Sequence, residues 1–202
     1  MLKAVSVISI AAALVSCDTG RQADPAASDS PPGLLVALAA VCGQAFEGRV
    51  TTTDPRDESF ASQRLVMHVR DCEDDVVRAP FHVGEDRSRV WVFTRHEDGS
   101  VELKHNHRHE DGEQDALSWY GGRTLGPGSG SSLAFPADDF SKALFEAEGI
   151  PDSMLNTWFV TATDTEYVYE LRRPNRHFRA VFDLTRPVET PPPAWGDEAL
   201  GE

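Results

Sequence analysis

Short runs of alternating hydrophobic and polar residues fill most of the chain between residues 47 and 185. Alternation with a period of two predicts β-strands, and the turn-forming residues between the runs predict short connections. Many short strands joined by tight turns are typical of an antiparallel sheet. The expected strands span residues 47–53, 62–71, 76–83, 88–96, 101–109, 114–120, 131–135, 156–163, 166–173 and 176–185.

Two other segments repeat their hydrophobic residues every three or four positions, which predicts helices. The first covers about residues 34–42 and is followed by Gly43; the second covers 137–148 and is followed by Gly149. Glycine just after the last helical residue is a common helix end. The sequence therefore predicts an all-β, mainly antiparallel domain with two short helices.

The dipeptides at the expected turns also predict how neighbouring strands pair. Asp-Gly at 98–99 and at 111–112 is typical of two-residue hairpin turns, and Pro-Asn at 174–175 is expected to form a third turn. Opposite charges are favoured at facing positions of an antiparallel pair. The expected facing pairs are Arg95 with Glu102, Arg108 with Asp115, and Glu170 with Arg179.

The order of these elements, one helix before the strands and one between them, resembles the lipocalin-like (calycin) barrels. The resemblance lies in the topology and not in a motif, because the chain has no Gly-x-Trp opening of the lipocalin type. It implies a closed or nearly closed barrel. A sandwich of two sheets is the alternative that the same strands allow.

The N-terminus carries a short export signal. Lys3 is followed by an apolar run over residues 4–14, which is far shorter than the roughly 20 residues that a membrane-spanning helix needs. The run ends in Leu-Val-Ser-Cys at 14–17, which resembles the lipobox of bacterial lipoproteins. The resemblance implies cleavage before Cys17, lipidation of Cys17 and a domain in the periplasm. Asp18 resembles a signal for retention at the inner membrane.

Composition divides the chain into four parts. Residues 1–17 are the expected signal peptide, and the polar, non-periodic residues 18–32 are an expected disordered tether. Residues 33–186 form the expected β domain. Residues 187–202, with three consecutive prolines, are expected to be a disordered tail.

The formal net charge of the chain is −14 at pH 7. So acidic a surface repels phosphate backbones and anionic headgroups, which argues against nucleic acid as a partner and against electrostatic docking to a membrane. The membrane is therefore an expected partner only through the lipid on Cys17.

Cysteine usage fits an oxidising compartment. Of three cysteines, Cys17 is assigned to the lipid, which leaves Cys42 and Cys72 as an expected disulfide. In the chain-entropy model, a loop of this length stabilises the fold by about 3.5 kcal/mol. No Cys-x-x-Cys spacing indicates a redox or metal-binding pair.

One strand carries unusual chemistry. In an extended strand over 101–109, His105, His107 and His109 share one face. The expected registers place the face of Val90, Val92 and Thr94 on one side, and the face of Ser118 and Tyr120 on the other. If this face points inward, it forms a pocket with an apolar wall and a polar floor. The residues of the expected pocket are His105, His107, Ser118, Tyr120 and Thr94. The sequence leaves open which face is buried.

Metal binding is a second interpretation of this strand. Two histidines at i and i+2 can bind one zinc ion, but the first and third of His105, His107 and His109 lie about 13 Å apart in a strand. A further ligand would come from elsewhere, with Glu110 or another acid as a base. The candidates by elimination are His68, His82, His96 and His177. A polar strand face without any ligand is the third interpretation.

The glycine-rich residues 121–131 match neither a P-loop nor a nucleophile elbow and are expected to form a mobile loop. No catalytic constellation is recognised, so the first hypothesis is a lipoprotein with a binding or interaction domain and no assigned catalysis. The alternatives are a zinc enzyme or metal carrier, and a structural envelope component that docks a protein partner.

Overall fold

The computed structural model describes residues 33–197. The expected signal peptide, tether and lipidation site at Cys17 lie outside the described residues. Within residues 33–197, eleven strands form one antiparallel sheet that curls into a nearly closed barrel with three short α-helices. The all-β, lipocalin-like barrel predicted from the sequence is confirmed. The helices number one more than expected, because a four-residue helix precedes β2.

The strands and helices follow one another closely along the chain. In order they are α1 (Leu34–Ala40), β1 (Ala45–Val50), η1 (Pro55–Asp57), α2 (Glu58–Ala61), β2 (Leu65–His68), β3 (Asp71–Cys72), β4 (Val76–Val83), β5 (Asp86–Arg95), β6 (Val101–His107), β7 (Tyr120–Arg123), β8 (Ser132–Pro136), α3 (Asp139–Ala147), η2 (Pro151–Leu155), β9 (Thr157–Ala162), β10 (Glu166–Arg173) and β11 (Arg176–Val188). No helix within the described residues is long and apolar enough to cross a membrane.

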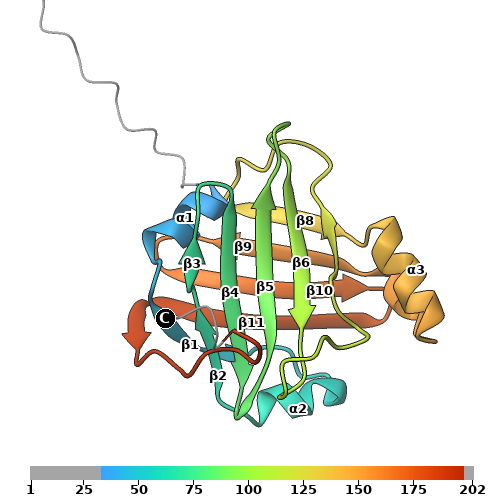
Figure 1. Cartoon of the computed structure of the whole chain (residues 1–202), viewed down its shortest axis with the longest axis horizontal. Helices are drawn as coiled ribbons and strands as arrows, with labels where there is room; N and C mark the ends of the chain where they lie inside the picture. Colours follow the sequence, from blue (N-terminus) through green and yellow to red (C-terminus); the bar gives the residue numbers. More distant parts are fainter. Residues whose placement is uncertain (1–32, 198–202) are drawn as a thin grey trace, which may run out of the picture.

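The strand order is β7-β6-β5-β4-β2-β1-β11-β10-β9-β8, with β3 paired to β4. Figure 1 shows the two walls that result: β4, β5 and β6 run across β9, β10 and β11 on the opposite side of the barrel. An isolated bridge between Gly122 and Ala137 joins the first and last strands of this order. The two walls therefore belong to one continuous, nearly closed sheet and not to a sandwich of separate sheets.

Two glycines make this closure possible. A Cβ atom on Gly121 would lie 1.8 Å from the carbonyl oxygen of Leu103, and one on Gly122 would lie 1.8 Å from that of Pro136. Only glycine lets the backbones of β6, β7 and the end of β8 approach this closely. The expected mobile loop over 121–131 is therefore wrong at its start, because residues 121–123 belong to β7.

We expect Gly122→Ala to lower the free energy of unfolding by about 2–3 kcal/mol, since neither backbone at the seam can yield without breaking strand pairs. Denaturant unfolding measures the effect. Gly126→Ala is the matched control because a Cβ atom there meets nothing within 4 Å, and we expect a change within about 0.5 kcal/mol. Equal stability of both variants would contradict a closed seam.

Two of the three predicted registers are wrong by one residue. Arg95 faces Val101 and Arg108 faces Gln114, because each hairpin has a three-residue loop. In both loops the last residue is a glycine in the left-handed region, with φ of 79° at Gly99 and 84° at Gly112. That geometry is the three-residue loop with a bulge, and it moves the pairing by one position.

The C-terminal hairpin follows its predicted register. Glu170 faces Arg179 across the two-residue turn at 174–175, where Asn175 takes a φ of 58°. Asparagine tolerates this left-handed conformation better than most residues, which fits its place in the turn.

The shifted register reverses which face of β5 is internal. Trp91 faces His105 and Phe93 faces Leu103, and both aromatic side chains are buried in the core. Val90 and Val92 instead point outward and pack against Ala194. The neighbours that we expected for the histidine face were therefore on the wrong side of the sheet.

The C-terminal segment differs from the expected disordered tail. β11 continues to Val188, and residues 189–197 return over the outer face of β4 and β5. The backbone N–H of Trp195 donates to the carbonyl of Arg87, and Asp197 pairs with Arg70 at 2.8 Å. Residues up to Asp197 thus cover the outward valines of β5.

The predicted strand at 114–120 is also wrong. Trp119 has a φ of 60°, in the left-handed region that a bulky side chain rarely adopts, and this interrupts an extended chain. Residues 108–119 therefore form a loop, and β7 begins at Tyr120.

The predicted disulfide is confirmed. Cys42, which follows α1, is bonded to Cys72 in β3, with a Cα–Cα distance of 6.2 Å. The side chains of Leu34 and Leu38 on α1 are fully buried, and α1 packs against β4 and β9. The helix thus covers one end of the barrel, and the disulfide fixes it to the wall.

Candidate ligand-binding cavity

The barrel interior contains a cavity of about 400 Å³. Residues of β4–β7 and β9–β11 form its wall, and residues of α2, α3 and η2 form its rim at the end away from α1. This volume falls in the range of small-molecule sites in proteins, which are concave, mostly apolar and few in number.

Aromatic side chains form most of the wall. Trp91 in β5, Trp158 in β9 and Tyr169 in β10 occupy alternating inward positions of their strands and are almost fully buried. The ring of Trp91 stacks on Phe81 with centroids 4.6 Å apart and on Tyr169 at 4.7 Å. Such offset contacts hold flat rings in place and leave an apolar surface of fixed shape.

A buried polar hub lies at the floor of the cavity. His105 Nδ1 is 3.1 Å from the carbonyl oxygen of Tyr120, and His105 Nε2 is 2.7 Å from the hydroxyl of Tyr169. A carbonyl can only accept, so Nδ1 carries the proton and the Tyr169 hydroxyl donates to Nε2. The indoles of Trp91 and Trp158 lie close enough to the same hydroxyl to lower its pKa slightly, against the larger opposite effect of burial.

The hub is uncharged. Burial lowers the pKa of His105 to about 3, and burial raises the pKa of Tyr169 well above its ordinary value. At neutral pH the imidazole is neutral and both of its nitrogens are occupied, so it offers no free lone pair to a metal ion.

His107 and Tyr120 form a second polar pair on the same wall, with the Tyr120 hydroxyl 3.3 Å from His107 Nε2. Burial, with a smaller effect of nearby Arg89, lowers the pKa of His107 to about 4, and burial raises the pKa of Tyr120 to about 12. These groups stay neutral across the physiological range and give the cavity a hydrogen-bonding side without charge.

The structure brings together three of the five residues of the expected pocket. His105, His107 and Tyr120 line the cavity. Thr94 faces Glu102 on the outward side of the sheet. Ser118 accepts a hydrogen bond from the backbone N–H of His107 and lies outside the cavity lining, so the expected places of Thr94 and Ser118 were wrong.

The expected metal ligands do not converge. His109 is outside the barrel, with 58% of its side chain exposed and Nε2 3.7 Å from Asp115. No group of three potential metal-ligating side chains comes together in the part of the chain that the structure describes. The other histidines considered, His68, His82, His96 and His177, do not line the cavity.

Sequence reasoning missed the arginines of the cavity: Arg89 from β5, Arg173 from the end of β10 and Arg176 from the start of β11. No motif marks them. Their only signal is the basic composition of the turn over 172–176, which becomes informative once β10 and β11 are known to line a cavity.

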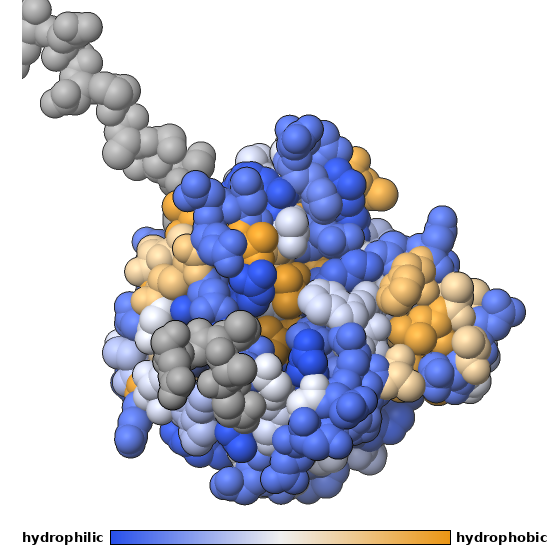
Figure 2. Space-filling view, in the orientation of Figure 1, coloured by the Kyte–Doolittle hydropathy of each residue, from blue (hydrophilic) through white to orange (hydrophobic). Residues whose placement is uncertain are grey.

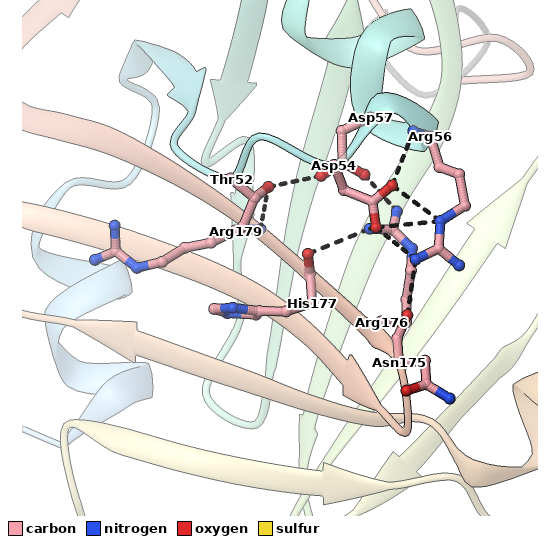
Figure 3. A network of polar contacts seen from close by, with 8 residues as sticks. All are labelled: Thr52, Asp54, Arg56, Asp57, Asn175, Arg176, His177 and Arg179. Carbon is pink, nitrogen blue, oxygen red and sulfur yellow. Dashed lines mark hydrogen bonds and ion pairs between the residues drawn. The ribbon is translucent and has the colours of Figure 1, made fainter.

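A polar network fixes the β10–β11 turn against η1 (Figure 3). Arg176 pairs with the buried carboxylate of Asp57 and approaches Asp54, and Arg56 donates to the carbonyl of Asn175 at 2.7 Å. The side-chain hydrogen bonds from Arg56 hold the pKa of Asp54 well below its ordinary range. These contacts keep the rim in one arrangement.

Arg173 is bound differently. Its Nη1 donates to Ser153 Oγ at 2.8 Å and to Asn156 Oδ1 at 3.2 Å, and both acceptors are neutral. Among residues 33–197, no carboxylate lies within ion-pair distance of this half-buried guanidinium.

Exposed apolar side chains adjoin the rim. Phe140 on α3, Ile150 between α3 and η2, and Leu155 on η2 are large and exposed, and Figure 2 shows apolar surface gathered over α3. Ile150 also lines the cavity, so this apolar surface is continuous with the interior.

Comparisons of the chain with protein-family models, with curated proteins and with solved structures gave no match.

Proposed function

We propose that this protein binds a small, largely apolar organic molecule inside its barrel and does not catalyse a reaction on it. The observation that carries the proposal is the aromatic-lined cavity of about 400 Å³, whose floor is a neutral polar hub. An apolar ligand would replace water at these rings, which is favourable in proportion to the apolar area that both partners bury.

The state of the hub supports binding over catalysis. A general base works best with a pKa near the operating pH, whereas burial lowers the pKa values of His105 and His107 to about 3 and about 4. The proton of the Tyr169 hydroxyl is donated to His105 Nε2 at 2.7 Å, so it is not free to act on a ligand.

We further propose that the binding domain belongs to a lipoprotein of the bacterial cell envelope, anchored through Cys17 and facing the periplasm. The lipobox-like signal over residues 14–17 supports the anchor, and Asp18 favours the inner membrane. The Cys42–Cys72 disulfide fits an oxidising compartment.

The test uses the full chain with Cys17→Ser, exported so that the disulfide can form and free of detergent because the expected lipid is absent. We expect the neutral dye Nile red to bind with a blue-shifted emission. Leu171→Trp places an indole in the cavity and should weaken binding by about tenfold or more, or about 1.4 kcal/mol.

Leu125→Trp is the matched control, because Leu125 is 97% exposed and lies outside the cavity. This variant should bind Nile red as the parent chain does. Absence of dye binding to the parent, or equal binding by the Leu171→Trp variant, would refute a ligand site in the barrel.

A further inference from the structure

The arginines of the cavity differ in what their charges already bind. Arg89 pairs with Asp86, and Arg176 pairs with Asp57. Arg173 donates only to the neutral acceptors Ser153 and Asn156. Of these three cations, Arg173 is the one whose charge has no ion-pair partner in the described part of the chain.

The unused donors of Arg173 form one edge of its guanidinium. Both of its side-chain hydrogen bonds leave from Nη1, so Nε and Nη2 make none to residues 33–197. On Arg56 the same edge binds the Asp54 carboxylate, with Nε 2.9 Å from Oδ1 and Nη2 2.5 Å from Oδ2. This two-pronged geometry is the preferred way for arginine to hold a carboxylate.

The position of Arg173 decides where a charged group can lie. The floor holds only neutral polar groups around His105, and an unpaired carboxylate buried there would lose its hydration without compensation. Ser153 and Asn156 belong to η2 and its C-cap, so they place Arg173 at the rim. Two carboxylates oppose an anion here: Asp115, which lines the cavity, and Asp152, which acts on Arg173 from beyond ion-pair distance.

We infer that the ligand is an amphiphilic carboxylate, with its apolar body against the aromatic wall and its head on the Nε–Nη2 edge of Arg173. This inference rests on the proposed function and adds the chemical class of the ligand. The protein would then select organic acids over neutral and cationic molecules of the same shape, despite its net charge of −14.

The test compares decanoate, decanol and decylamine, which share one apolar chain and differ in the head. Binding to the full chain with Cys17→Ser is measured by calorimetry at neutral pH. We expect decanoate to bind about tenfold more tightly than decanol, as a charge-assisted pair of hydrogen bonds at a half-buried site allows, and decylamine to bind most weakly.

Arg173→Gln should abolish the preference for decanoate over decanol. Arg172→Gln removes the same charge from the next residue, which is exposed and bound to Glu170, and should keep the preference. Arg173→Lys retains the positive charge but lacks the paired Nε and Nη2 donors, so it should lose most of the preference for decanoate. This variant replaces Arg173→Gln in the test if the glutamine variant folds poorly.

The outcomes separate this inference from the proposed function. Two outcomes would refute the carboxylate class and leave the binding function standing. In the first, decanol and Nile red bind but decanoate binds no more tightly than decanol. In the second, the Arg173→Gln variant still binds decanoate more tightly than decanol. Preference for decylamine would assign the head to Asp115 and refute the role of Arg173. If none of these molecules binds, the proposed function itself fails.

Discussion

Tyr169→Phe is expected to lower the free energy of unfolding by about 2 kcal/mol, although it removes a single oxygen atom. The hydroxyl of Tyr169 donates to His105 Nε2 at 2.7 Å, inside the buried core. Its loss leaves the buried His105 Nε2 without a partner, at a cost of roughly 1–3 kcal/mol. Guanidinium unfolding followed by fluorescence measures the change.

Tyr167 provides the matched control on the same strand. Its side chain is fully buried, but its hydroxyl has no hydrogen-bond partner within residues 33–197. Tyr167→Phe therefore removes an unsatisfied polar atom and should leave stability unchanged or raise it by about 1 kcal/mol. Similar losses for the two variants would show that the hub does not act as a connected network.

The strands were predictable because the barrel wall has one buried face, which imposes a period of two on the sequence. The register was predictable only where the turn was short. At the 174–175 turn, two residues connect β10 and β11 and Glu170 faces Arg179 as expected. At Gly99 the loop has three residues and not the expected two. The extra residue shifts the pairing by one position, so that Trp91 lies on the inner face of the sheet where Val90 was expected.

Only the part of the candidate site that comes from the neighbouring strands β6 and β7 was predictable from the sequence. His105, His107 and Tyr120 come from neighbouring strands, so alternation along β6 was enough to bring them together. Trp158 and Arg173 come from the opposite wall and meet the histidines only because the sheet curls and Gly122 bridges to Ala137. Nothing local in the sequence encodes that closure, so the cavity and its arginine could not be found.

Acidification from pH 7 to about pH 5 is expected to lower the free energy of unfolding by roughly 5 kcal/mol. Burial lowers the pKa of His105 to about 3 and those of His82 and His107 to about 4, from an ordinary value of 6.5. Between these values the unfolded chain binds protons that the folded chain does not. Stability is therefore fully present above about pH 6.5 and is lost as the pH falls toward the folded pKa values.

Few other groups change the free energy of unfolding between pH 7 and about pH 5. Carboxylates with lowered pKa values, such as Asp86 and Asp138, lose their contribution only at lower pH, where they become protonated. Burial raises the pKa of Asp197, which opposes the trend, because protonation of this carboxyl favours the folded state. The histidines thus govern the slope just below pH 6.5.

One variant can show how much of the pH dependence of the unfolding free energy comes from His105 in the hub. His105→Gln should reduce the dependence of unfolding free energy on pH by up to about 1.4 kcal/mol per pH unit below pH 6.5, whatever its effect on stability at pH 7. The parent chain is the reference for this slope. Equal slopes for the variant and the parent chain would mean that His105 takes up a proton in the folded barrel. The Tyr169 hydroxyl could then no longer donate to its Nε2, and the neutral floor on which the ligand proposal depends would be lost.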